Sequence, residues 1–462
     1  MPSTDGFVDF SPIDEQPIAE VSRGGSIEAD RAVGSARGAS ATWGSMPPKE
    51  RADVLRRVAD GVEARVAELA AVETRDNGSL LRSMRTSVMP RVARNFRFFA
   101  DQLLALETGR KEYEGFAERV AWDPSGVTVV ITPWNAPLML ATWRVAPALA
   151  AGNAVILKPP EWAPLTASML ADIAHEAGLP DGAFNVLQGV GDEAGAALTA
   201  HPGVDRIAFT GSVPTGTLVA QAAGANLTPV SLELGGKSPF VAFADADLDA
   251  VVQQAVNQFD NAGQVCLAGT RLIVERSMHD AFLERFVKAA GAIVQGDPRE
   301  ETTDIGPQIT REHFERVDGF VQRAKADGAT AVFGGGPNDE LGGLYYRPTL
   351  FTDAPLGSEI LMREVFGPVL TLQTFETEDE AVELANSTRY GLAAIVYTGD
   401  EARAERVSSA LVAGTVWVNC FFVRDLAAPF GGARGSGIGR EGGPWSFDFY
   451  ADVKNVCTAP WN

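Results

Sequence analysis

The sequence predicts an α/β protein with two doubly wound lobes, in which helices cover both faces of largely parallel sheets. From Gly126 onward, short runs of β-branched residues alternate with helical patterns, and a second series of the same kind includes Leu272. Strands that alternate with helices in this way form parallel sheets. A chain of 462 residues is about three times the length of a typical domain, which leaves room for two lobes.

The first element that we expect is an amphipathic helix over residues 47–72, because its apolar residues recur at three- and four-residue spacing; Asn77-Gly78 ends it. The strands expected in the first series are 127–131, 154–157, 184–187, 206–209 and 230–234, with helices at 166–178, 192–200 and 215–222. The strands expected in the second series are 272–274, 369–372, 393–397 and 415–418. Residues 113–123 and the tail after Trp445 fit neither series, so each is a candidate hairpin or terminal strand used in assembly.

Composition narrows the classes of function. Lysine and arginine total 39 and aspartate and glutamate total 60, so the net charge of −21 repels phosphate backbones and anionic membranes. Three cysteines are too few for a disulfide framework, and no cluster of the four histidines has zinc-ligand spacing. The most apolar stretch is too short to span a membrane, and the acidic N-terminus is unlike a signal peptide. We therefore expect a cytoplasmic protein that binds no nucleic acid, membrane or metal.

Cys266 is the first candidate for chemistry, because it ends the polar, glycine-containing segment 259–265. Its thiolate would be a strong nucleophile if neighbouring amides or a helix start depressed the pKa of the thiol. The alternative is a buried structural cysteine, which is the commoner role of a lone cysteine. We expect that structural role for Cys420 and Cys457.

Two polar residues near predicted strand ends are further candidates. Glu233 is a candidate general base, because partial burial raises the pKa of a carboxyl towards neutrality. Asn135 follows the first predicted strand, and its amide NH2 is suited to stabilise a developing oxyanion. The alternatives are a solvated loop carboxylate for Glu233 and a proline-rich turn for Asn135. Segment 189–195 has the spacing G-x-G-x-x-x-G, which alone is a weak indication of a dinucleotide site.

Together these segments resemble the aldehyde dehydrogenase superfamily in order and spacing, from Pro12 to Val453. The most specific motifs are Glu-Leu-Gly-Gly-Lys at 233–237 and Phe-x-Asn-x-Gly-Gln-x-Cys at 259–266. The other matching segments are 132–135, 209–212, 364–368 and 429–432. The resemblance implies two α/β lobes and a small β oligomerisation element in a homodimer or homotetramer. The implied NAD-binding domain is 1–110 and 127–235, the catalytic domain 236–440 and the oligomerisation element 111–126 and 441–462.

The resemblance also implies a reaction, the NAD-dependent oxidation of an aldehyde to a carboxylic acid. Cys266 attacks the aldehyde to give a thiohemiacetal, whose oxyanion is held by the Asn135 amide and the Cys266 N–H. Loss of hydride to NAD leaves a thioester, and Glu233 activates the water that hydrolyses it. Glu441 matches a position that relays the proton, and a surface glutamate is its alternative.

The cofactor residues are implied in the same way. Lys158 and Glu161 reach the adenosine ribose, where the Glu161 carboxylate repels a 2′-phosphate and so favours NAD over NADP. Glu364 binds the nicotinamide ribose, with a helix-cap role as its alternative. The residues that approach the pyrophosphate are Gly191, Gly195 and Ser212. The remaining implied cofactor residues are Ile131, Thr132, Pro133, Trp134, Phe209, Gly211, Leu234, Gly235 and Phe366.

The substrate is indicated by segments that resemble the branch acting on 2-hydroxymuconate-type semialdehydes from aromatic ring cleavage, including its carboxymethyl-hydroxymuconate members. These segments are 94–101, 161–162, 419–426 and 446–450. We expect Arg97 and Arg424 to flank the substrate entrance and bind the far carboxylate of a semialdehyde, because a guanidinium binds a carboxylate bidentately. Structural ion pairs are the alternative for each arginine. The departures from the family pattern, which leave the exact substrate open, are Ala136, Pro160, Ala427 and Ala428.

Three other functions stay open. The first is a dehydrogenase of an uncharged aldehyde, aliphatic or aromatic. The second is a CoA-acylating enzyme, against which Glu233 argues, because that kind typically lacks this base. The third is a catalytically silent aldehyde-binding relative, against which the joint presence of Cys266, Glu233 and Asn135 argues.

Overall fold

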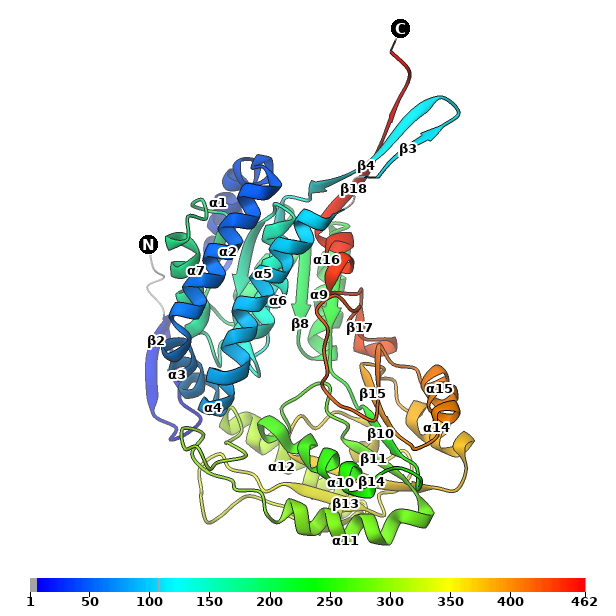
Figure 1. The fold of residues 1–462 in the computed structure, drawn as a ribbon. Coiled ribbons are helices and arrows are strands. Elements are labelled where there is room, and N and C mark those ends of the chain that lie inside the picture. The colour runs from blue at the N-terminus through cyan, green and yellow to red at the C-terminus, as the bar shows by residue number, and fades with distance from the viewer. Residues whose placement is uncertain (1–5, 107–108, 462) are drawn as a thin grey trace.

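The computed structural model describes residues 6–106 and 109–461, so the parts of the predicted domains at 1–5, 107–108 and 462 lie outside the described residues. Its first lobe is built on a six-stranded sheet with the order β17-β9-β8-β5-β6-β7 (Figure 1). The strands are β5 (Val127–Ile131), β6 (Ala154–Lys158), β7 (Phe184–Val186), β8 (Arg206–Thr210), β9 (Val230–Glu233) and β17 (Gly437–Ile438). All pair in parallel except β17, which is antiparallel to β9. Each strand predicted in this series therefore forms, within one residue at either end.

Helices cover both faces of this sheet, because successive strand residues point to opposite sides. Val130 packs on one face with α2 (Pro48–Ala64), α5 (Met89–Ala105), α6 (Pro137–Ala150) and α7 (Leu165–Glu176). Val129 packs on the other face with α1 (Ser26–Ser45), α8 (Ala196–Ala200) and α9 (Val213–Ala225). The helix predicted over 47–72 is divided at Arg65 into α2 and α3 (Val66–Asn77), because the backbone of Arg65 leaves the helical region. Gly78 ends α3, as predicted.

The second lobe contains a seven-stranded sheet with the order β12-β13-β14-β11-β10-β15-β16, parallel except for the β12 edge. The predicted strands form β11 (Arg271–Glu275), β14 (Val369–Phe375), β15 (Ala393–Tyr397) and β16 (Thr415–Val418). The strands that the sequence did not predict are β10 (Pro239–Ala242), β12 (Thr330–Phe333) and β13 (Thr349–Thr352). The helices are α10 (Leu248–Val256), α11 (His279–Ala290), α12 (Arg311–Ala326), α13 (Glu359–Met362), α14 (Glu378–Asn386) and α15 (Glu401–Ala410). The doubly wound α/β prediction is confirmed for both lobes.

A three-stranded antiparallel sheet projects beyond the first lobe (Figure 1). It consists of β3 (Arg110–Tyr113), β4 (Phe116–Pro124) and the C-terminal strand β18 (Ala451–Thr458), which follows α16 (Gly443–Tyr450). The two segments that fitted neither α/β series thus form a hairpin and a terminal strand. A second, unpredicted hairpin near the N-terminus pairs β1 (Gly6–Phe10) with β2 (Pro17–Ser22).

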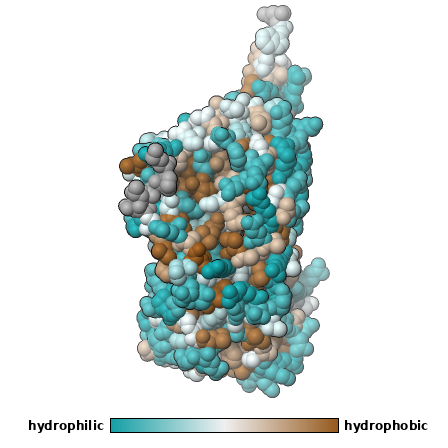
Figure 2. Space-filling view, turned by 90° about the vertical axis from the view of Figure 1, so that its left-hand side faces the viewer, coloured by the Kyte–Doolittle hydropathy of each residue, from teal (hydrophilic) through white to brown (hydrophobic). Residues whose placement is uncertain are grey.

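The remaining short elements are α4 (Leu81–Ser83), η1 (Met84–Val88), η2 (Gly191–Gly195), η3 (Asn257–Gly263), η4 (Arg276–Met278) and η5 (Arg434–Ser436). No helix in the described part of the chain is long and apolar enough to cross a membrane. The face seen in Figure 2 mixes hydrophilic side chains with patches of hydrophobic ones. The carboxyl ends of β5, β6, β8 and β9 lie at one edge of the first sheet, and this is the edge at which ligands of such sheets bind.

Candidate active site

Cys266 follows a short, strained turn of the second lobe. Within η3, Asn261 and Ala262 have φ of 50° and 55°, a conformation that costs a non-glycine residue about 1 kcal/mol or more. At Gly263, where φ is 73°, a side chain would overlap the Gly367 carbonyl. The Gln308 side chain donates to the Ala262 carbonyl at 3.1 Å and so helps to hold the turn. A backbone fixed in this way is typical of functional sites.

Asn135 joins this turn to the first lobe. Its Nδ2 donates to the carbonyl of Gln264 at 2.9 Å, and its own carbonyl accepts from the Asn261 side chain at 3.2 Å. The turn that contains Asn135 therefore contacts the second lobe at Gln264, two residues before Cys266. An amide nitrogen has two hydrogens, so a second N–H remains for a ligand.

Glu233 ends β9 and is 6% exposed. Neither carboxyl oxygen has a hydrogen-bond partner among the described residues. Burial and the charge of Glu441 raise the pKa of Glu233 to about 8, against the opposing charges of Arg144 and Arg424. Glu233 is thus a buried carboxyl near neutrality, not the solvated loop carboxylate of the alternative, and it has the properties of a general base.

Glu441 is placed beside β9 because β17 pairs with that strand and Phe430 and Glu441 form a backbone bridge. Its side chain is 2% exposed, which rules out the surface-glutamate alternative. Its Oε1 lies 2.9 Å from Arg144 Nη1 and accepts from Ser231 Oγ at 3.1 Å. Sequence analysis missed Arg144, although it is the one charged residue in the otherwise apolar α6.

Arg424 lies against aromatic side chains at this site. Its guanidinium carbon is 3.6 Å from the centre of the Phe430 ring and 4.8 Å from that of Trp143. Its Nη2 is buried and has no hydrogen-bond partner in the described part of the chain. Burial lowers the pKa of Arg424, whereas the nearby charges of Glu233, Glu441 and Cys266 act to raise it. Arg424 therefore shares the electrostatic environment of these three groups.

Arg97 is not part of this cluster, which corrects the position expected from the sequence. Its guanidinium pairs with Asp60 at 2.6 Å and also with Glu63, both on α2, so the ion-pair alternative applies. Arg91, on the same helix α5, lies 5.4 Å from the Trp143 ring instead. Burial and the charges of Arg424 and Arg94 lower the pKa of Arg91 to about 9. The substrate segment identified in the sequence began at residue 94, three residues beyond Arg91.

The Cys266 thiol is half-buried and free. Burial and the carboxylates of Glu364 and Glu233 raise its pKa to about 12, and the charge of Arg424 compensates only in part. The residues around Cys266 therefore raise the pKa of its thiol and do not depress it. A base is needed to remove the thiol proton, and two carboxylates with a pKa near neutrality, Glu364 and Glu233, act on the thiol through their charge. Glu364 already accepts from Gly236 N–H, whereas both Glu233 oxygens are without a hydrogen-bond partner among the described residues.

A second group of predicted residues lies at the carboxyl ends of the first sheet. Lys158, at the end of β6, is buried, and its Nζ pairs with Glu161 Oε2 at 2.8 Å. Gly191 N–H donates to Glu161 Oε1 at 3.3 Å. Burial alone would raise the pKa of Glu161, but the Lys158 ammonium and the backbone N–H groups of Glu161 and Gly191 together lower it, so Glu161 is ionised. A fixed carboxylate at this edge is suited to accept hydrogen bonds from sugar hydroxyls.

Glu364 reaches from the second lobe to the glycine pair after Glu233. Its Oε1 accepts from Gly236 N–H at 3.0 Å, and a side chain at Gly235 would overlap its carboxylate. Glu364 follows the last helical residue of α13 by two positions, so the helix-cap alternative does not apply. Burial raises its pKa to about 7, despite the Gly236 N–H and the charges of Arg316 and Lys237.

The ring of Trp134 packs against three other rings. The distance between ring centres is 5.2 Å to Phe366, 5.0 Å to His313 and 6.0 Å to Trp162. Ser212 caps α9 by accepting from Thr215 N–H at 3.2 Å. The other predicted cofactor residues, all at or just after the carboxyl ends of β5, β8 and β9 or in η2, are Ile131, Thr132, Pro133, Gly195, Phe209, Gly211 and Leu234. These residues lie along the carboxyl ends of the neighbouring strands β9, β8, β5 and β6, where ligands of such sheets bind.

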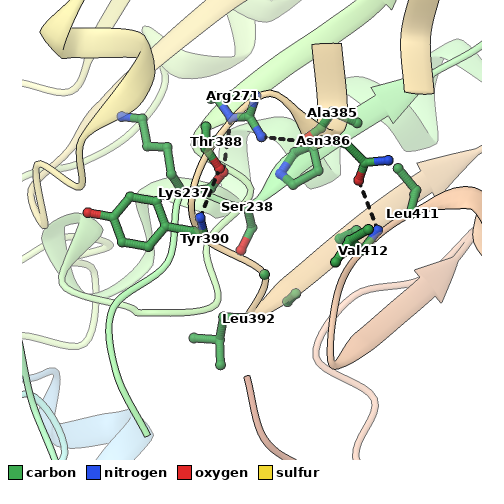
Figure 3. A pocket seen from close by; sticks show the side chains of 14 residues that line it. Lys237, Ser238, Arg271, Ala385, Asn386, Thr388, Tyr390, Leu392, Leu411 and Val412 are labelled. Carbon is green, nitrogen blue, oxygen red and sulfur yellow. Dashed lines mark hydrogen bonds between the residues drawn. The ribbon is translucent and has the colours of Figure 1, made fainter. Parts of the chain in front are cut away.

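A small hollow is lined in part by Lys237 and Ser238, the two residues that follow the glycine pair (Figure 3). Its lining includes Lys237, whose ammonium is buried without a hydrogen-bond partner in residues 6–106 and 109–461. Burial and the charge of Arg271 lower the pKa of Lys237 to about 7, against the charge of Glu364. Arg271 instead donates to the Ala385 carbonyl at 2.6 Å. Lys237 is the last residue of the Glu-Leu-Gly-Gly-Lys motif at 233–237, but the sequence predicted no role for it.

The chain belongs to the aldehyde dehydrogenase family, which it matches over residues 2–456. It is 44% identical to the 2-hydroxymuconic semialdehyde dehydrogenase of Pseudomonas sp. (strain CF600), over 98% of this chain and 95% of that protein. It is 40% identical to the 2-aminomuconic semialdehyde dehydrogenase of Danio rerio, over 97% and 94% of the two chains. A crystal structure of indole-3-acetaldehyde dehydrogenase with NAD+ superposes with a TM-score of 0.97 at 38% identity, covering 100% of this chain and 95% of that one. These similarities confirm the resemblance and the fold.

Proposed function

We propose that this aldehyde dehydrogenase oxidises a semialdehyde that carries a carboxylate, such as a hydroxymuconate semialdehyde, to the corresponding acid. The observation that supports this substrate most directly is the pairing of Arg424 and Arg91 around Trp143. Neither arginine forms an ion pair within the described residues, so both keep donors for a ligand. Two half-buried guanidiniums whose positive charges act on each other favour the binding of an anion. The names of the two muconic semialdehyde relatives support the same class of substrate.

We propose the catalytic roles as follows. Glu233 takes the proton of the Cys266 thiol, and the thiolate attacks the aldehyde carbon to form a thiohemiacetal. The free N–H of Asn135 and the backbone N–H of Cys266 stabilise the oxyanion. After hydride loss, Glu233 passes the thiol proton to Glu441, which Arg144 fixes, and the restored Glu233 carboxylate then takes a proton from the water that attacks the thioester, so that the acid forms and the Cys266 thiolate leaves. The fact that Glu233 is buried and near neutrality supports its role as the base in both steps.

For the cofactor we propose NAD, which accepts the hydride when bound. Lys158 and Glu161 would hold the adenosine ribose, and Glu364 would hold the nicotinamide ribose. The ionised Glu161 disfavours a 2′-phosphate at its end of the edge. Support comes from the Lys158–Glu161 pair and from the NAD+ in the similar crystal structure.

The Glu161 assignment predicts a change of cofactor preference. Glu161→Gln should raise the ratio of kcat/KM for NADP over NAD about tenfold, because repulsion of the 2′-phosphate is lost and one hydroxyl acceptor is weakened. Steady-state kinetics with both cofactors measure it. Glu193→Gln, an exposed change two residues beyond Gly191, serves as a control for net charge. An unchanged ratio in Glu161→Gln would show that this carboxylate does not face the ribose.

The Arg424 assignment predicts a selective loss of substrate binding. Arg424→Ala should raise KM for an acidic semialdehyde about 10- to 100-fold more than KM for an uncharged aldehyde, since a hydrogen bond to a charged group contributes about 1.5–3 kcal/mol. Arg91→Ala should act in the same direction. Arg97→Ala, on the same helix as Arg91, is the matched control, because its guanidinium pairs with α2. Equal effects of Arg424→Ala on both aldehydes would exclude the carboxylate site and favour an uncharged substrate.

We further propose that the six-stranded lobe is the NAD-binding domain, the seven-stranded lobe the catalytic domain, and the projecting sheet the oligomerisation element. Tyr113 and Val453 on that sheet are each 55% exposed, which supports a partner at this place. A cytoplasmic homodimer or homotetramer fits these features. Sedimentation as a monomer of 49.0 kDa would contradict the assembly.

A further inference from the structure

The guanidinium of Arg424 is fixed by rings and not by carboxylates. Phe430, 3.6 Å away, comes from the segment before β17, and Trp143, 4.8 Å away, comes from α6 of the first lobe. Both distances lie within the range of cation–π attraction. Two aromatic residues from distant parts of the chain thus meet on one guanidinium.

This arrangement leaves the donors of Arg424 free. Arg97 shows the opposite case, since two α2 carboxylates already use its N–H groups. A guanidinium donates in its own plane, whereas a ring attracts it through its face. Stacking therefore fixes the position of Arg424 without using the in-plane donors, and its Nη2 stays buried and unpaired among the described residues.

Both rings are themselves held in place. Trp143 is 4% exposed and packs 5.4 Å from Phe99. Phe430 is fixed through its backbone, which donates to the Glu441 carbonyl at 2.8 Å and accepts from Glu441 N–H at 2.7 Å. The same pairing that places the Glu441 carboxylate thus also places the Phe430 ring.

We infer that Trp143 and Phe430 are positioning residues that hold Arg424 by stacking and thereby set the preference for aldehydes with a carboxylate. The inference rests on the proposed function of Arg424. The two rings act through the guanidinium, and the substrate carboxylate is bound by its in-plane N–H groups. Replacing either ring with a side chain that has no aromatic face should therefore weaken the preference for aldehydes that carry a carboxylate.

The experiment compares Phe430→Leu and Trp143→Leu with Phe430→Tyr and Trp143→Phe, which keep an aromatic face. KM is measured for an acidic semialdehyde and for an uncharged aldehyde of equal length. Each leucine variant should raise the acid-to-uncharged KM ratio about tenfold, and each aromatic variant should restore it within about threefold. Phe422→Leu, which removes a half-exposed ring packed against Phe421, should leave the ratio unchanged.

A double-mutant cycle separates the inference from the function on which it rests. In the Arg424→Ala background, Phe430→Leu should cause no further change in the ratio, because its effect acts through that guanidinium. If Arg424→Ala raises the acid-to-uncharged KM ratio but Phe430→Leu leaves it unchanged, the inference about the rings is overturned and the proposed function of Arg424 stands. If Arg424→Ala itself leaves the ratio unchanged, the proposed carboxylate site fails. A Phe430→Leu effect of equal size in both backgrounds shows a general packing role and also overturns the inference.

Discussion

Replacing Cys266 with serine should lower kcat for aldehyde oxidation by about four orders of magnitude or more, the usual result of removing a covalent nucleophile. The burial and the two carboxylates that raise the pKa of the thiol to about 12 act equally against ionisation of a hydroxyl, which is a weaker acid to begin with. Serine is close in size, so the turn that holds the residue is preserved. The measurement is NADH formation at saturating aldehyde.

Cys457→Ser is the matched control, since this thiol is exposed on β18. It should retain wild-type kcat. The Kd of Cys266→Ser for NAD, measured by the quenching of tryptophan fluorescence, should also match that of the wild type. A Cys266→Ser variant that keeps more than a tenth of wild-type kcat would show that another group attacks the aldehyde.

Replacing Glu233 with glutamine should lower steady-state kcat by about 10²- to 10⁴-fold, the range typical of general-base catalysis. The amide fits the buried site but takes no proton. Because burial raises the pKa to about 8, about a tenth of the Glu233 carboxyls are ionised at pH 7. The wild-type kcat should therefore rise with pH and level off above pH 8, and the variant should lose this rise.

A control for folding follows from the same pKa. The folded-state pKa of Glu233 lies above the ordinary value of 4.5, so its ionisation weakens the fold progressively between pH 4.5 and about 8. Glu233→Gln should therefore unfold at no lower temperature than the wild type at pH 8. If kcat of the variant is unchanged and its pH profile keeps the rise near 8, Glu233 is not the base.

The strands of the first lobe were predictable because buried parallel strands are continuous apolar runs between turns. The missed strand β10 has only four residues and starts at Pro239, so it lacks that pattern. The division of the predicted helix at Arg65 was not predicted, because the apolar spacing continues across it from α2 into α3. Both misses arise where tertiary contacts and backbone geometry, not periodicity, decide the element.

At the site, the motifs pointed to Cys266, Glu233 and Asn135, and the fold brings the segments that contain them together. Arg144 was missed, and Phe430 was given no role although it lies in the matching segment 429–432, because the roles of both depend on partners that are distant in the sequence. Arg97 was misplaced for a geometric reason: it lies six positions after Arg91, about 240° around an α-helix, and so faces α2. A sequence motif does not indicate which face of α5 meets the substrate.

The most direct test of the proposed chemistry is the intact mass of Glu233→Gln after one turnover with NAD and an acidic semialdehyde, without CoA. We expect NADH to form slowly, because the Cys266 thiol has also lost its base, and an acyl adduct to accumulate on Cys266 in amount equal to that NADH, because hydrolysis of the thioester has lost its base. NADH formation without an adduct on Cys266, or NADH that appears only when CoA is added, would contradict the account.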